Sequence, residues 1–215
     1  MKKIISILFA SMIFTSSAYA GGLIGLKYGI GDLEGTKLVT TNVTPSPADA
    51  QTTASVDHEY GAIYAEFNVN ESPVSVGLEV VPLTGTISIV NDDSDASVEV
   101  SDLTTAYLLA AKELGNGGSV YAKLGYSHAD IENAKQSSGN NTITAFSDSL
   151  EGPMVGVGFQ SPENSIGLVF RAEATYSEFD DISVNTTRNP DSLKETKKAN
   201  DITFQTFTVS VAKTF

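Results

Sequence analysis

The sequence contains no cysteine, and its cationic residues are outnumbered by its acids. Lys and Arg together count 13 against 26 Asp and Glu, which gives a formal net charge of −13 over 215 residues. Without cysteine, no disulfide can stabilise the chain in an oxidising compartment. The acidity argues against a nucleic-acid partner, because phosphate backbones are bound through Lys and Arg.

The sequence also lacks an apolar run long enough for a transmembrane helix, which needs about 20 residues. The longest candidate, from Ile4 to Phe14, follows Lys2 and Lys3 and ends at the small-residue pattern Ala-Tyr-Ala at 18–20. This order is typical of a secretory signal peptide, so residues 1–20 are predicted to be cleaved. A buried N-terminal helix is the alternative. The remaining residues 21–215 are expected to form one domain, with a net charge of −13 − 2 = −15 once the two lysines are removed.

Alternation of apolar with small or polar residues recurs along this domain and indicates β-strands. The last nine residues, FTVSVAKTF, show it clearly: Phe207, Val209 and Val211 alternate with Thr208 and Ser210. In TTAYLLAAK the pattern is poor, and we place Leu103, Tyr107 and Leu109 on the apolar face against Thr104, Ala106 and Lys112. Eight strands are predicted in total, the others within LIGLKYGIG, YGAIYAEF, VSVGLEV, VYAKLGYS, MVGVGFQ and IGLVFRAEATY.

The connections between these strands alternate in length. Polar segments at about 32–57, 130–149 and 180–200, and one containing NDDSDAS whose flanks could extend a tall hairpin, alternate with short links such as SPENS. Short periplasmic turns and long extracellular loops are typical of outer-membrane barrels. The predicted fold is therefore all-β, an eight-stranded antiparallel up-and-down transmembrane β-barrel in the cell outer membrane, with apolar residues facing lipid. A soluble periplasmic ligand-binding barrel is the alternative.

Several segments resemble known small barrels. FTVSVAKTF resembles the C-terminal signal of outer-membrane proteins, an alternating strand that ends in Phe, and VYAKLGYSHA and FRAEATYSEFDD resemble strands of barrels of the opacity-protein and OmpA-transmembrane-domain kind. The resemblance implies that the outer-membrane assembly machinery recognises this strand, and that lipid and lipopolysaccharide surround the barrel. Its signal residues are Phe207, Val209, Val211 and Phe215.

Charged residues lie on the predicted inward face. An eight-stranded barrel is only wide enough for side chains to fill it, and buried charges need partners, so we expect a salt-bridge network that fills the lumen. A gated polar pathway or a binding cavity is the alternative. The residues are Lys27, Glu66, Glu79, Lys112, Lys123, Arg171 and Glu173.

No catalytic, cofactor or metal site is predicted. Ser127 and His128 are adjacent in a strand, so their side chains point to opposite faces and cannot form a nucleophile–base pair. The acids Asp92, Asp93 and Asp95, and those at Glu178, Asp180 and Asp181, do not complete a calcium-loop pattern and are read as solvated.

Together these features predict a structural or surface-interaction role, such as adhesion, carried by the extracellular loops and an unidentified surface partner. A narrow pore for ions or small solutes is the first alternative. A lipid-A-modifying enzyme is a further one, and it would need Ser127 to find a base elsewhere in the fold.

Overall fold

The structure is a computed structural model of the chain. It describes residues 21–41, 50–69, 72–82, 85–91, 94–137, 141–143, 147–188 and 193–215, so the predicted signal peptide and the acids Asp92 and Asp93 lie outside the described residues. The described chain is almost entirely β-strand, and no helix in it has the length and apolar character that a membrane span needs. The strands are β1 (Gly22–Thr41), β2 (Ala50–Asn68), β3 (Val74–Val80), β4 (Gly85–Asn91), β5 (Ser94–Glu113), β6 (Ser119–Ser137), β7 (Asn141–Ile143), β8 (Ser147–Gln160), β9 (Leu168–Phe179), β10 (Ile182–Arg188) and β11 (Leu193–Thr214).

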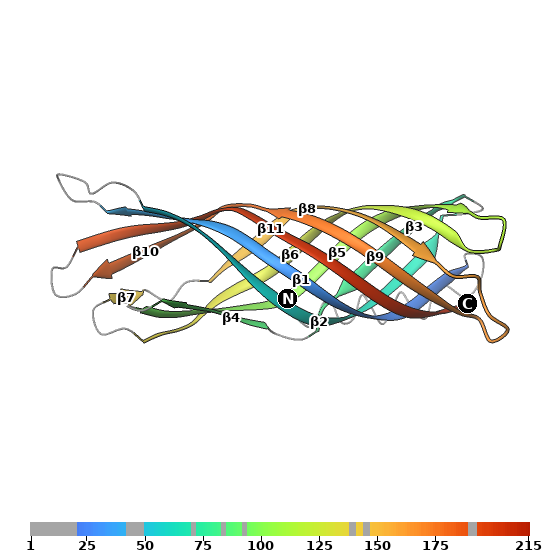
Figure 1. The fold of residues 1–215 in the computed structure, drawn as a ribbon, viewed down its shortest axis with the longest axis horizontal. Helices are drawn as coiled ribbons and strands as arrows, with labels where there is room; N and C mark the ends of the chain where they lie inside the picture. The colour runs from blue at the N-terminus through green and yellow to red at the C-terminus, as the bar shows by residue number, and fades with distance from the viewer. Residues whose placement is uncertain are drawn as a thin grey trace.

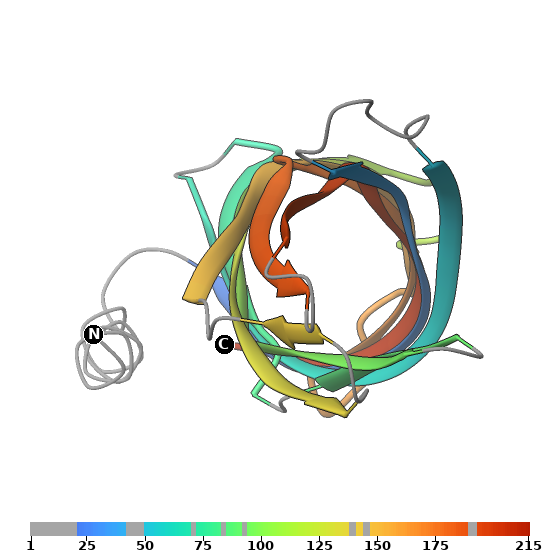
Figure 2. The ribbon, with the colours of Figure 1, turned by 90° about the vertical axis from the view of Figure 1, so that its left-hand side faces the viewer.

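Eight of these strands close into a cylinder in which every neighbouring pair is antiparallel (Figures 1 and 2). Their order is β1-β2-β3-β5-β6-β8-β9-β11, and β11 returns to pair with β1 from Leu23↔Thr214 to Thr41↔Glu195. The predicted eight-stranded up-and-down barrel is therefore confirmed. The shorter β4 pairs with β5, β10 with β11, and β7 with β10, all at one end of the molecule.

The C-terminal strand is paired to its last residue. Gly22 and Phe215 exchange two backbone hydrogen bonds of 3.0 Å, and the Phe215 ring meets Phe67 edge-on with centroids 6.2 Å apart. Lys213, which interrupts the apolar outer face, donates a 2.6 Å hydrogen bond to the carbonyl of Ile166 in the turn before β9. The chain end is thus part of the barrel wall, because pairing with β1 leaves it no free edge.

The two ends of the barrel differ in height. At the end that holds both Gly22 and Phe215, the connections are tight turns such as Leu114–Gly118, where Gly117 has a φ of +82°. At the other end the segments predicted as long loops are largely strand: β1 and β2 stay paired as far as Val39↔Ala50, and β4 and β5 as far as Asn91↔Ser94. We call these the short-turn end and the long-strand end. The tall hairpin expected around NDDSDAS is therefore present as β4 and β5. The boundaries predicted for the other three long loops were wrong, because polar residues on both faces hide a strand that continues beyond the apolar stretch.

An apolar belt surrounds the barrel next to the short-turn end. On β6 the outward residues run from Val120 through Leu124 to Tyr126, and His128 follows as the first polar one. Ten residue steps from Gly118 to His128 rise about 25 Å along the barrel axis when the strand is tilted by about 40° to that axis. The other strands also turn polar at this level, at Asp32, Glu59, Glu151, Glu178 and Gln205. Exposed apolar side chains that form the belt include Leu26, Ile30, Leu108, Val155, Val157, Phe159, Phe170, Tyr176, Phe207 and Val209.

The predicted orientation of β5 was wrong by one residue. Tyr107 and Leu109 are each 3% exposed and face the lumen, whereas Leu108 is 51% exposed and belongs to the belt. A β-bulge shifts the register between Ser101 and Thr104, and Asp102 within it has a φ of +55°. Because side chains alternate with a period of two, this phase places Lys112 on the outside, where it is exposed, and excludes it from the lumen.

Candidate functional site: a sealed lumen

The lumen is filled by three positive and three negative side chains. The inward positions of five strands bring together six residues that were all predicted from the sequence: Lys27, Glu66, Glu79, Lys123, Arg171 and Glu173. The seventh predicted residue, Lys112, is not part of this group, because the phase of β5 places it on the outer surface. The six formal charges cancel, so a desolvated layer of this kind carries no net charge to bury. We call these residues the charge layer.

Arg171 and Glu66 form one half of the charge layer. The two terminal guanidinium nitrogens of Arg171 donate to the two carboxylate oxygens of Glu66 at 2.7 and 2.8 Å, and Arg171 Nε donates to Gln160 Oε1 at 2.7 Å. The Tyr107 hydroxyl adds a 2.7 Å hydrogen bond to Glu66 Oε1. Such a bidentate pair fixes both groups in orientation as well as in distance.

Glu173 organises the other half. It accepts hydrogen bonds from Lys27 at 2.7 Å, from Lys123 at 3.1 Å and from the Tyr121 hydroxyl at 3.0 Å. Lys27 also bonds Glu79, whose carboxylate lies 3.5 Å from Lys123. Arg171 and Glu173, two apart on one strand face, do not bond each other but meet through Tyr121, whose ring centroid lies 5.1 Å from the Arg171 guanidinium.

Three tyrosines that were not predicted as part of the charge layer complete it, and one of them, Tyr107, was expected on the outer face. Tyr64, Tyr107 and Tyr121 lie directly opposite Gly25, Gly77 and Gly158 in the neighbouring strands. A Cβ at any of these glycines would collide with the tyrosine ring. Each ring therefore lies across the strand beside it, where only glycine leaves room. The paired glycine and tyrosine are the signal that sequence reasoning could have used, had the register been known.

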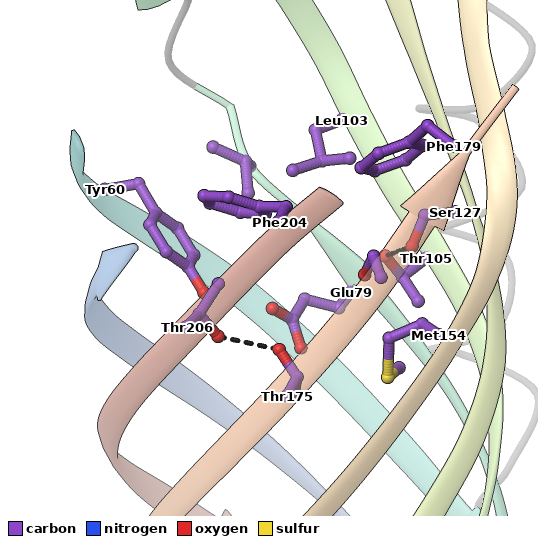
Figure 3. Close-up of a pocket in the computed structure, with 12 residues that line it drawn as sticks. Tyr60, Glu79, Leu103, Thr105, Ser127, Met154, Thr175, Phe179, Phe204 and Thr206 are labelled. Carbon is purple, nitrogen blue, oxygen red and sulfur yellow. Dashed lines mark hydrogen bonds between the residues drawn. The ribbon is translucent and has the colours of Figure 1, made fainter. Parts of the chain in front are cut away.

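A small cavity lies beyond the charge layer toward the long-strand end (Figure 3). Its volume is about 30 Å³, which leaves space for about one water molecule. Hydroxyl pairs line it, with Thr175 and Thr206 at 2.7 Å and Thr105 and Ser127 at 2.8 Å. Toward the short-turn end, a wider polar mouth of about 1090 Å³ opens below Arg171 and Glu66.

An apolar layer closes the lumen above this cavity. It consists of the buried residues Ala129, Ile131, Leu150, Phe179 and Ile202, against which Leu103 and Phe204 also pack. In Figure 3 the rings of Phe179 and Phe204 and the side chain of Leu103 lie on one side of the cavity, away from Glu79 and Thr175. The lumen is therefore blocked twice, first by paired charges and then by packed hydrocarbon.

The geometry at Ser127 and His128 does not form a catalytic pair. Ser127 is buried in the lumen against Thr105, whereas His128 lies on the outer surface with Nδ1 3.0 Å from Glu151 and Nε2 3.4 Å from Asp130. Among the described side chains, no group of three or more His, Cys, Asp or Glu residues could hold a metal ion. The acids Glu178, Asp180 and Asp181 are exposed on the long-strand half.

No protein-family model matches the chain, and no curated protein matches its sequence. Solved structures match its fold over nearly their whole length. The outer membrane protein OprG of Pseudomonas aeruginosa aligns with 92% of this chain and 97% of its own, at 11% identity and a TM-score of 0.69. Two further similar structures are Neisserial surface protein A and the outer membrane protein AlkL in lipid bilayers. The first aligns with 88% of this chain and 97% of its own at 9% identity and a TM-score of 0.53, and the second with 94% and 93% at 16% identity and a TM-score of 0.51. The chain therefore has the fold of the small eight-stranded outer-membrane β-barrels.

Proposed function

We propose that the protein is an integral barrel of the cell outer membrane that acts at the cell surface through its long-strand end, with a lumen that does not conduct. The apolar belt supports the membrane position, because its height of about 25 Å equals the lipid-facing band of such barrels. The short-turn end would then face the periplasm and the long-strand end the exterior. Lipid and lipopolysaccharide are the partners that this belt and its polar upper border would meet.

The observation that carries the proposal is the doubly closed lumen below a wall that continues past the apolar belt. A pore would need a continuous polar path through the lumen. All six charged groups of the charge layer instead form ion pairs with one another, and the apolar layer lies beyond them. The strands nevertheless continue well past the belt, as in β1 and β2, which remain paired to Val39↔Ala50. A sealed barrel that extends its wall outward is suited to surface contact, such as adhesion, rather than to transport.

Orientation can be tested first, because the chain has no cysteine to interfere. Single variants Ser94→Cys at the long-strand end and Asn116→Cys at the short-turn end would be treated on intact cells with a membrane-impermeant maleimide. We expect Ser94→Cys to be labelled and Asn116→Cys to be labelled only after the cells are lysed. The reverse pattern would reject the proposed orientation.

A measurement of conductance distinguishes this proposal from a narrow pore. The charged residues in the middle of the lumen and the wide mouth at the periplasmic end are the features that would favour a pore. The purified protein in a planar bilayer should show no channel steps. A Tyr107→Ala/Tyr121→Ala variant, which removes two rings from the charge layer but leaves the apolar layer, should also remain closed. Regular steps from the unmodified protein would establish the pore instead.

Surface contact is tested with lipid vesicles that carry the protein. We would compare retention of these vesicles on bacterial cells and on mammalian cell monolayers for the unmodified protein and a variant whose residues 86–99 are replaced by an Asn-Gly turn. A Gly-Ser insertion after Asn116 is the matched control at the short-turn end. Retention that is lost only in the first variant supports the proposal, whereas equal retention of all three, or none above empty vesicles, would contradict it.

A further inference from the structure

The long-strand end is divided into two sheets. In one, β2 pairs with β1, β1 with β11, and β11 with β10 from Ile182↔Ala199 to Arg188↔Leu193. In the other, β4 pairs with β5, β5 with β6, and β6 with β8 as far as Glu132↔Ser147. Figure 1 shows the two groups diverging at the end of the barrel away from Phe215.

One side of this division is bridged. The segment β7, in the connection from β6 to β8, crosses to pair with β10 from Thr186↔Ile143 to Arg188↔Asn141. Below it, the apolar layer joins the sheets through side chains of both, such as Ile131 and Leu150 against Ile202. The two sheets are therefore held together along their β8–β10 side.

The opposite side has no such bridge in the described part of the chain. Pairing between β2 and β3 ends at Ile63↔Val80, and the next residue, Val81, donates its N–H to Leu103 of β5. Beyond that point β4 pairs only with β5, and the β2 segment 50–62 pairs only with β1. The outer edge of β4 and the facing edge of β2 thus border a seam in the wall.

These two edges have an unusual composition for this chain. Gly85–Asn91 contains no charged residue and no proline, and four of its seven residues are β-branched. The first seven residues of β2, from Ala50 to Val56, are also uncharged, although the chain has 26 acids. Natural edge strands are commonly protected by Lys or Pro, and β-branched residues favour strand pairing. An uncharged, unprotected edge selects a partner through its backbone rather than through charge.

We propose that the free edge of β4 binds an extended polypeptide segment of another protein, which adds to the sheet as a further strand. The proposal rests on the surface function proposed above and specifies how contact is made. Seven residues at about 3.3 Å each offer a docking edge of about 23 Å, along which an added strand can form main-chain hydrogen bonds. Specificity would then come from main-chain hydrogen bonds and from side chains at alternate positions.

A second copy in the same membrane fits this edge less well. Copies in one membrane are related by rotation about its normal, so strands tilted by about 35–45° would cross at about 70–90°. Antiparallel pairing requires the axes of two neighbouring strands to run side by side at a small angle to each other. A flexible segment of a different protein has no such restriction, because it can approach in either direction.

The test uses a fluorescent peptide that copies Ser94–Val100, the segment that β4 already pairs on its other edge. Titrated with the protein in lipid vesicles, it should bind saturably, and the same peptide with proline in place of Val98 should bind at least tenfold more weakly. Hydrogen exchange gives a direct readout, because alternate amides of an edge strand point away from its partner. Alternate amides of β4 should exchange fast in the free protein and become protected with the peptide.

Variants then separate this inference from the surface function. Ile87→Lys/Ile89→Lys should weaken peptide binding at least tenfold, and Asn116→Lys, at the other end, should not. Strand addition is wrong if the doubly substituted protein binds the peptide normally or if the peptide protects no β4 amide. It is also wrong if β4 is fully protected without peptide, because β2 or a second copy then covers the edge. Vesicle retention on cells that persists in such a case would leave the surface function standing alone.

Discussion

Arg171 and Glu66 are joined by two parallel hydrogen bonds in the middle of the lumen, although 105 residues separate them in the chain. Both side chains are buried, and Glu66 also accepts from Tyr107. The pair links β2 to β9 across the interior rather than through the wall. It therefore couples strands that are not neighbours in the cylinder, which local pairing cannot do.

Removal of one partner of this ion pair should lower the free energy of unfolding considerably. Glu66→Gln leaves the Arg171 guanidinium buried opposite a neutral amide, and breaking a buried pair in this way costs about 3–5 kcal/mol. The free energy of unfolding, measured in lipid vesicles by urea titration, should fall by that amount. The exposed Lys112→Gln is the control and should change it by less than about 0.5 kcal/mol. A combined Glu66→Met/Arg171→Met variant that is no more stable than Glu66→Gln would show that the pair is not the source of the loss.

The glycines opposite the lumen tyrosines should not tolerate a side chain. Gly77→Ala would force the Tyr107 ring away from its position and from Glu66, and overpacking of this kind costs about 1–3 kcal/mol. Stability in the same titration should fall accordingly. Gly115→Ala provides the contrast, because a Cβ at Gly115 meets no atom within 4 Å. Similar losses at both positions would indicate a general effect of removing glycine.

Much of this barrel could be predicted from the period of its side chains, and the failures have physical causes. The inward charges of β1, β2, β3, β6 and β9 follow from clean alternation, as with Lys27 between Leu26 and Tyr28. The phase of β5 does not, because Leu108-Leu109-Ala110-Ala111 is apolar at consecutive positions and the bulge at Asp102 resets the register. The tall hairpin around NDDSDAS was expected, but the extensions of the other long connections were missed because Ser and Thr on both faces give no periodic signal. The partners within the charge layer depend on register across the lumen, which no local pattern encodes.

The phase of β5 and the membrane position of the belt can be tested together. Leu108→Arg and Leu124→Arg place a charge on the lipid-facing side of neighbouring strands, where it costs about 2–4 kcal/mol near the bilayer midplane. At the polar border Gln205→Arg should cost only about 0–1 kcal/mol. Unfolding titrations in vesicles would measure all three. If Leu108→Arg is tolerated as well as Gln205→Arg, then Leu108 does not face lipid.

The C-terminal residue should matter more for assembly than for the finished fold. Phe215 is exposed on the belt, and its side chain contacts mainly Phe67 and Gly22, so Phe215→Ala should lower stability by about 1 kcal/mol. If the assembly machinery reads this residue in the unfolded chain, as the resemblance of FTVSVAKTF implies, the same variant should accumulate severalfold less in the outer membrane of growing cells. Refolding of the purified chain into vesicles without that machinery should proceed to a similar yield.

Lys213→Met is the matched variant, since it removes the 2.6 Å hydrogen bond to Ile166 but keeps the terminal aromatic residue. It should reduce the stability of the barrel without reducing its delivery to the outer membrane. Equal losses of both variants in cells would assign the defect to barrel closure rather than to recognition.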